Sequence, residues 1–120
     1  MRRCRILLAG AALLLWAGTA RAFIPEGAVE GRPGFSFRRL TYYWSHVELE
    51  IVNGTTQNAI FGGTMVFLNR HRVPVARVEL LPEKIKRRST RRYRAVFTLG
   101  SGHEAAAASH LVWEFNQRNN

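Results

Sequence analysis

The chain has 120 residues, with 18 Lys and Arg against 8 acidic side chains, and its formal net charge at pH 7 is +10. A chain of this length is expected to form one domain. Its only cysteine, Cys4, excludes a disulfide within the chain, so the core has to hold without covalent cross-links.

The first 22 residues have the three-part layout of a secretory signal peptide. Three arginines fall among residues 2–5, residues 6–17 form an apolar run broken only by Gly10, and residues 20–22 are a small-x-small cleavage signal. A run of about a dozen residues is shorter than the roughly 20 that cross a membrane as a helix. We therefore expect cleavage after Ala22, a periplasmic or secreted location in a bacterium, and no transmembrane segment in the mature chain.

Removing 22 residues leaves a mature chain of 98, with fourteen Lys and Arg against eight Glu and a net charge of +6. Such a charge attracts polyanions at low salt without specificity. Residues 23–34 contain three Gly and two Pro and are predicted to be a flexible arm. The polar residues 117–120 are predicted to be a disordered tail, which leaves 35–116 as the folded domain.

The folded part begins with short segments in which apolar and polar residues alternate. Phe35 and Phe37 share one face of a predicted strand, and residues 40–44 are rich in aromatic side chains, which favour strands. Over 46–51 three aliphatic residues alternate with polar ones. This pattern is typical of an antiparallel strand with one face on the core and one in water. The inward set is Val47, Leu49 and Ile51.

The next two strands are predicted around the most apolar part of the chain, residues 59–69. The Gly62-Gly63 pair inside this run predicts a bulge or a bend. After a polar turn, the following strand covers residues 73–81, and Pro82 is expected to end it.

The stretch KIKRRSTRRYR, residues 84–94, contains seven Lys and Arg residues. Tyr93 begins an inward-facing alternation of apolar residues, so the neighbouring arginines are expected to face outward, and Ser89-Thr90 is suited to a turn. A short Ala-rich segment at 104–108, suited to one helical turn or to a bridging loop, and a last strand at 110–115 follow. Six or seven short strands without a long amphipathic helix predict an all-β sandwich or a small barrel.

Three pieces of this pattern resemble a known family. VELEIVNGT, GGTMVFLNRHRVPV and IKRRSTRRYRAVF follow in the order of the FxLYD-type domains of exported bacterial proteins. Phe67 and Leu68 match the start of that family's signature, whereas Arg-Ser-Thr stands where the family usually has Pro-Gly. The resemblance implies an immunoglobulin-like antiparallel β-sandwich of about seven short strands, acting as an exported accessory or adhesion-like module without catalysis.

Motifs for catalysis and metal binding are incomplete in this sequence. His103-Glu104 resembles the start of a zinc-protease motif, but the second His is replaced by Ala107. The mature chain has no Cys and no Asp, so a tetrahedral metal site would need three histidines from distant loops. No serine lies in a nucleophile-elbow pattern, and no glycine-rich phosphate loop is present. The sequence predicts a protein that is not an enzyme and that binds no metal or cofactor.

Two smaller features have alternative interpretations. Asn53-Gly54-Thr55 is a glycosylation sequon, but Asn-Gly is among the strongest hairpin signals, and we favour a hairpin turn. Trp44 and Trp113 are expected in the core. An aromatic residue exposed around Trp44 would instead be a candidate contact for a partner or a glycan.

The basic stretch leaves two hypotheses open. In the first, the domain is a non-catalytic binding or assembly module, its arginines form a solvated strand face, and another protein adds a strand to a sheet edge. In the second, the stretch binds a polyanion of the cell envelope, such as lipopolysaccharide or acidic lipid, because guanidinium suits bidentate phosphate contact. Export and the shortage of outward aromatic residues argue against nucleic acid. The candidate polyanion-binding residues are Lys84, Lys86, Arg87, Arg88, Arg91, Arg92 and Arg94.

Overall fold

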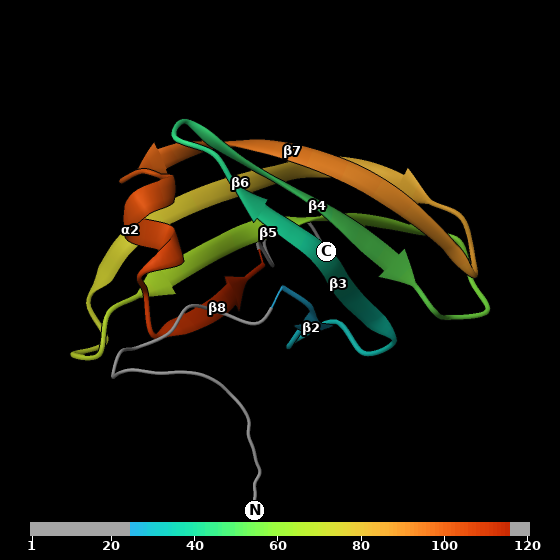
Figure 1. The fold of residues 1–120 in the computed structure, drawn as a ribbon. Helices are drawn as coiled ribbons and strands as arrows, with labels where there is room; N and C mark the ends of the chain where they lie inside the picture. The colour runs from blue at the N-terminus through green and yellow to red at the C-terminus, as the bar shows by residue number, and fades with distance from the viewer. Residues whose placement is uncertain (1–24, 116–120) are drawn as a thin grey trace, which may run out of the picture.

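The computed structural model describes residues 25–115, so the predicted signal peptide at 1–22 and the predicted tail at 117–120 lie outside the described residues. The described chain consists of seven strands and one short helix (Figure 1), which confirms the predicted all-β class. The elements are β2 (Gly27–Ala28), β3 (Phe35–Tyr42), β4 (His46–Asn53), β5 (Ala59–Leu68), β6 (Pro74–Ile85), β7 (Ser89–Leu99), α2 (Gly102–Ala106) and β8 (His110–Glu114).

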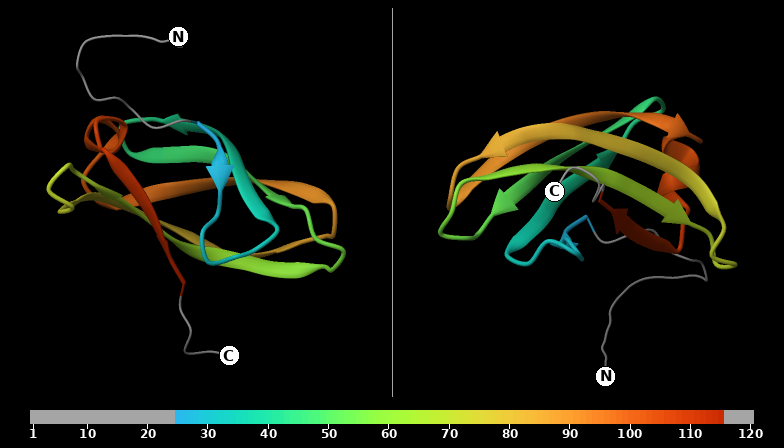
Figure 2. Two further views of the ribbon diagram at one scale, coloured as in Figure 1. Left: turned by 90° about the horizontal axis from the view of Figure 1, so that it is seen from below. Right: turned by 180° about the vertical axis from the view of Figure 1, so that it is seen from behind.

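All neighbouring strands pair antiparallel, in the order β2-β3-β4-β7-β6-β5-β8. The consecutive strands β5, β6 and β7 lie side by side, and β4 lies beside β7, which is a Greek-key arrangement. Ladder pairs between β6 and β7 involve only Arg77 and Val78 of β6. The sheet curls, and its two edge strands, β2 and β8, lie on the same side of the molecule (Figures 1 and 2).

The hydrophobic core lies inside the curl of the sheet and contains side chains from β3, β5, β7 and β8. Phe61 on β5 is fully buried, and its ring centroid lies 5.2 Å from that of Phe35 and 6.2 Å from that of Tyr93. Trp113 on β8 contacts both Phe61 and Phe37, with centroids 5.9 Å apart in each case. Aromatic pairs of this kind each add about 0.5–1.5 kcal/mol beyond the burial of their area.

The regular alternation predicted for β4 is confirmed. Val47, Leu49 and Ile51 are at most 1% exposed, whereas the intervening Glu48 and Glu50 are only half-buried. Alternate side chains of a strand point to opposite faces, so the core side of β4 is set by these three residues and the opposite side carries its charges.

The predicted irregularity at the Gly62-Gly63 pair is present, because the register of β5 on β6 shifts between Phe61 and Gly63, but the extra residue lies on β6, where Leu81 and Pro82 stand opposite Gly62. The expectation that Pro82 ends the next strand is wrong, since β6 continues to Ile85. A Cβ on Gly62 would lie 2.9 Å from Pro82, so the glycine leaves the room that proline needs. Among the described residues this part of β6 has no ladder pair with β7, so the missing N–H of Pro82 breaks no ladder there.

The expected hairpin at Asn53-Gly54 is also wrong, because β4 pairs with β3 and β7 and not with β5. Asn53 is fully buried, and its side-chain amide donates to the carbonyl oxygens of Gln57 and Ile85 at 2.9 and 3.0 Å. Its side-chain oxygen accepts from the N–H and the hydroxyl of Thr55 at 2.9 and 2.6 Å. Asn53 therefore shapes the crossing from β4 to β5 and ties it to the end of β6.

The described part of the predicted arm, residues 25–34, contains the short strand β2, which pairs with β3. Val29 is buried, and its N–H donates to the Phe35 carbonyl at 3.1 Å. A strand of two residues is too short to show a period in the sequence, which explains why it was not predicted.

The Ala-rich segment after β7 forms α2, as expected of one helical turn, and Ala105 is fully buried. This helix lies at one end of the curled sheet, between β7 and β8 (Figure 1). No helix within residues 25–115 has the length and apolarity to span a membrane.

Candidate binding surfaces

The basic stretch forms the end of β6, a tight turn and the first half of β7. The turn lies at 86–88, where the Ser89 N–H donates to the Lys86 carbonyl at 3.1 Å. The expected turn at Ser89-Thr90 is therefore wrong, because both residues belong to β7.

Backbone conformation and one long-range contact hold this turn in place. Arg88 has φ +56°, in the left-handed region, which costs a non-glycine residue about 1–2 kcal/mol. The Arg87 N–H donates to the side-chain oxygen of Asn58 at 2.9 Å. The turn is therefore tied to the connection between β4 and β5.

Two of the predicted site residues, Arg92 and Arg94, lie on the outer face of β7. The register of β4 on β7 places Glu50 opposite Arg92 and Glu48 opposite Arg94. Directly opposite residues of an antiparallel pair have neighbouring side chains. These two arginines therefore stand opposite carboxylates in the ladder, although neither forms an ion pair with a described residue.

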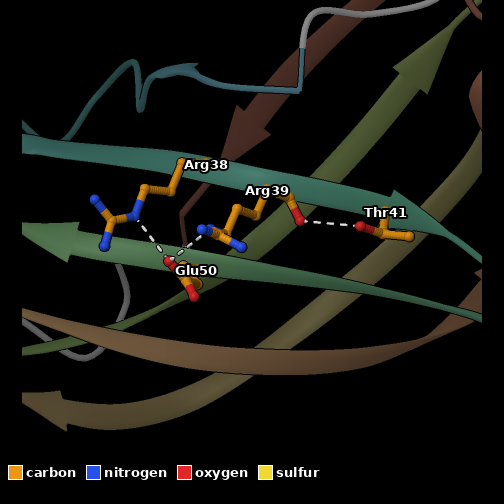
Figure 3. Close-up of polar contacts among 4 residues, drawn as sticks. All are labelled: Arg38, Arg39, Thr41 and Glu50. Carbon is orange, nitrogen blue, oxygen red and sulfur yellow. Dashed lines mark hydrogen bonds and ion pairs between the residues drawn. The ribbon is translucent and has the colours of Figure 1, made fainter.

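Two further arginines reach Glu50 from β3 (Figure 3). Its carboxylate accepts a hydrogen bond from Arg38 Nε at 2.7 Å and lies 3.9 Å from Arg39 Nε. Arg39 lies at a register shift of β3, has φ +57°, and its carbonyl accepts from the Thr41 hydroxyl at 3.2 Å. The hydrogen bond from Arg38, together with the charges of Arg38, Arg39 and Arg92, lowers the pKa of Glu50. We refer to Arg38, Arg39, Arg92 and Arg94 as the outer arginine cluster.

The other predicted site residues divide between one paired arginine and four unpaired cations. Arg91 Nη2 lies 3.0 Å from Glu83 Oε1. The remaining four side chains are exposed and form no ion pair with any described residue. A hollow of about 340 Å³ is lined by residues of this segment, among them Arg91. We refer to Lys84, Lys86, Arg87 and Arg88 as the basic turn.

Tyr93 lies on the inner face of β7, as its alternation predicted. Its hydroxyl donates to the Phe61 carbonyl at 2.8 Å. Burial, followed by the charge of Glu83, raises the pKa of Tyr93 to about 12. The inner face of β7 is thus fixed by a buried hydrogen bond, while its outer face carries arginines.

A second surface lies where the curled sheet does not close. β2 and β8 are the two ends of the strand order, and a hollow of about 510 Å³ is lined by residues of both strands, with Phe37 and Trp113. Trp113 is 8% exposed, and its indole N–H has no hydrogen-bond partner among the described residues. A buried unpaired donor costs roughly 1–3 kcal/mol. We refer to this hollow as the β2–β8 gap.

A third hollow, of about 610 Å³, lies beside Trp44. Trp44 is 76% exposed, so the expectation that it packs in the core is wrong, whereas the same expectation for Trp113 is confirmed. The reason is local, because β3 ends at Tyr42 and Trp44 lies in the connection to β4. The adjacent Tyr43 stacks on His46 with ring centroids 4.6 Å apart.

Within residues 25–115, no three His, Cys, Asp or Glu side chains come together in a way that could hold a metal ion. Sequence reasoning found the basic stretch and the possible exposure near Trp44, but it missed the β2–β8 gap. That gap depends on β2, which the sequence did not predict, and on the curl of the sheet, which no local pattern reports.

Comparison of the chain with models of protein families, with curated proteins and with solved structures gives no match in any of the three.

Proposed function

We propose that the protein is an exported, non-catalytic binding module whose partner adds a strand to the free edge of β8. The observation that carries this proposal is the β2–β8 gap, where an unpaired sheet edge lines a hollow and the indole N–H of Trp113 is buried without a partner.

Proteins often block edge-to-edge pairing with lysines, prolines or bulges on the edge strand. The sequence of β8, HLVWE, contains no lysine or proline, and its pairing with β5 runs without a register shift. Its unpaired backbone groups therefore offer main-chain hydrogen bonds to an incoming strand, and its alternate side chains offer specificity.

Site-specific photo-crosslinking in the producing cells tests this proposal. A photoreactive residue in place of Val112 on β8 should form an adduct with a partner protein, and the crosslinked partner segment should be an extended one. The matched control is the exposed Glu79 on β6, which should give no such adduct. Equal labelling from both positions, or none from position 112, would overturn the proposal.

The immunoglobulin-like class belongs to the same proposal. The Greek-key order β4-β7-β6-β5, and the few ladder pairs between β6 and β7, support a division of the curled sheet into two facing layers. We keep the relationship to the FxLYD-type domains as part of this proposal, and the leader-like residues 1–22 are the ground for proposing a periplasmic or secreted location.

A second candidate function is favoured by the basic turn. Its four cations are exposed, form no ion pair with a described residue and lie around the β6–β7 connection at one end of the curled sheet (Figure 1). Near an anionic surface each contributes about 1 kcal/mol. We propose that the basic turn binds an anionic envelope component such as lipopolysaccharide or acidic lipid. Retention of the protein on immobilised lipopolysaccharide should fall steeply as salt rises, and retention independent of salt would exclude this function.

A further inference from the structure

The two edges that border the β2–β8 gap run in the same direction. Six successive antiparallel pairings separate β2 from β8 in the strand order, and an even number of reversals restores the original direction. Direct pairing of β2 with β8 would therefore be parallel, in a sheet whose other pairs are all antiparallel. One added strand that runs opposite to both edges would close the sheet with antiparallel pairs only.

The inner side of the gap suits apolar side chains. Phe37 and Trp113 line it, and both are buried residues of the core. Gly27 belongs to the same lining, and a Cβ there would already lie 3.3 Å from the Phe37 ring. An added strand would place alternate side chains over these rings.

The outer side of the gap carries unpaired negative charge on its β2 rim. Glu26 and Glu30 are exposed, both line the gap, and neither forms an ion pair with a described residue. Across the gap, Arg72 and His110 also line it. Glu114, at the end of β8, is already paired, because its Oε1 lies 3.3 Å from Arg77 Nη1. The net charge of the β2 rim is therefore negative, whereas the net charge of the whole protein is positive.

We propose, resting on the proposed function, that the occupant of the β2–β8 gap is an extended segment of a partner protein in which apolar residues alternate with Lys or Arg. The segment runs antiparallel to both β2 and β8. Its apolar side chains face Phe37 and Trp113, and its basic side chains lie beside Glu26 and Glu30. One strand of this kind converts two open edges into paired ones.

Two synthetic peptides of about eight residues test the proposal, one alternating valine with lysine and the other valine with glutamate. We expect the lysine peptide to bind the full protein about fivefold more tightly, since two exposed ion pairs distinguish the peptides. The net positive charge of the protein predicts the opposite preference, so the sign of the difference is decisive. The double substitution Glu26→Gln and Glu30→Gln should remove the preference for lysine and leave the fold intact.

A photoreactive group at either end of the lysine peptide tests its direction. The carboxyl end should label residues near Arg72 and His110, at the start of β8, and the amino end should label residues near Glu30. Reversed labelling, or a preference for the glutamate peptide, would overturn this inference while leaving strand addition itself intact. Absence of binding by both peptides, together with no adduct from position 112, would overturn strand addition as well.

A tethered form of the same test detects weak binding. Each peptide is appended after Asn120 through a short Gly/Ser linker, which gives an effective concentration of about 1 mM. The lysine extension should raise the midpoint of thermal unfolding and protect the amides of residues 110–114 from exchange, and the glutamate extension should do so less. Equal effects of the two extensions would contradict the charge pattern that we propose.

Discussion

The basic turn and the outer arginine cluster contain four cations each, and their surroundings differ, since Arg38 and Arg39 of the cluster form ion pairs whereas none of the turn cations does so with a described residue. In the cluster, β3 and β7 place arginines around Glu50 and Glu48 of the intervening strand β4. In the turn, no described carboxylate lies within ion-pairing distance of any of the four cations. The difference shows that strand register, rather than the number of charges in a stretch, decides which cations remain available to a ligand.

The largest expected effect comes from neutralising the basic turn. Replacing Lys84, Lys86, Arg87 and Arg88 with Gln should lower retention on immobilised lipopolysaccharide by more than about tenfold, because each cation near an anionic surface contributes about 1 kcal/mol. The midpoint of thermal unfolding should change little, since surface substitutions usually stay within about 0.5 kcal/mol.

The matched control for that variant replaces the four arginines of the outer cluster with Gln. This change should lower the midpoint of thermal unfolding and keep most of the retention, because Glu50 already pairs with Arg38 and Arg39 and interacts electrostatically with Arg92. If the two variants lose retention equally, net charge alone accounts for binding and the contrast between the regions has no functional meaning.

The second-largest effect is a loss of stability expected from a change at Tyr93, on the inner face of β7. Tyr93→Phe should destabilise the protein by about 1–3 kcal/mol, since the buried Phe61 carbonyl loses its donor. The native pKa of about 12, against an ordinary value of 10.0, means that folding favours the neutral phenol. That stabilisation is fully present below pH 10.0 and is lost as the pH rises towards about 12.

Urea unfolding across this pH range measures the effect. The wild-type protein should lose stability more steeply than the Tyr93→Phe variant, although Tyr42, whose pKa burial also raises, continues to contribute in both. Identical pH profiles would mean that Tyr93 is not protected from ionisation in the folded protein.

A smaller effect separates backbone strain from charge within the turn. Arg88→Gly should stabilise the protein by about 1 kcal/mol, because glycine adopts the left-handed conformation without steric cost. Arg87→Gly removes the same charge at a position outside the left-handed region, and it should not stabilise. Both variants should lose retention on lipopolysaccharide to a similar extent, and a gain in stability from both would remove the strain argument.

The smallest effect should come from Glu50→Gln. The lowered pKa of Glu50 means that its ionised form stabilises the fold above the ordinary glutamate pKa of about 4.3, and that this contribution is lost as the pH falls through the native pKa. The variant should therefore melt slightly below the wild type at pH 7, and the two should converge in acid. A difference that persists in acid would point to lost packing rather than lost charge.

Patterns in the sequence correctly predicted the features of the fold that depend on residues close together in the chain. Val47, Leu49 and Ile51 face the core as their alternation indicates, and the Gly62-Gly63 pair marks a register shift. Pro82 was assigned wrongly because its neighbour Gly62 lies on another strand, and that contact cannot be read from either segment alone. The β2–β8 gap was missed for the same reason, since it arises from the closure of the whole sheet.

The burial of Asn53 has a consequence for how the protein could be produced. The sequon Asn53-Gly54-Thr55 has its acceptor amide engaged with Gln57 and Ile85 in the interior, so an oligosaccharide can be attached only before the chain folds. In a eukaryotic secretory host the sugar would therefore mark molecules that were modified ahead of folding. The glycosylated fraction would then be larger the more slowly β4 and β6 come together during folding.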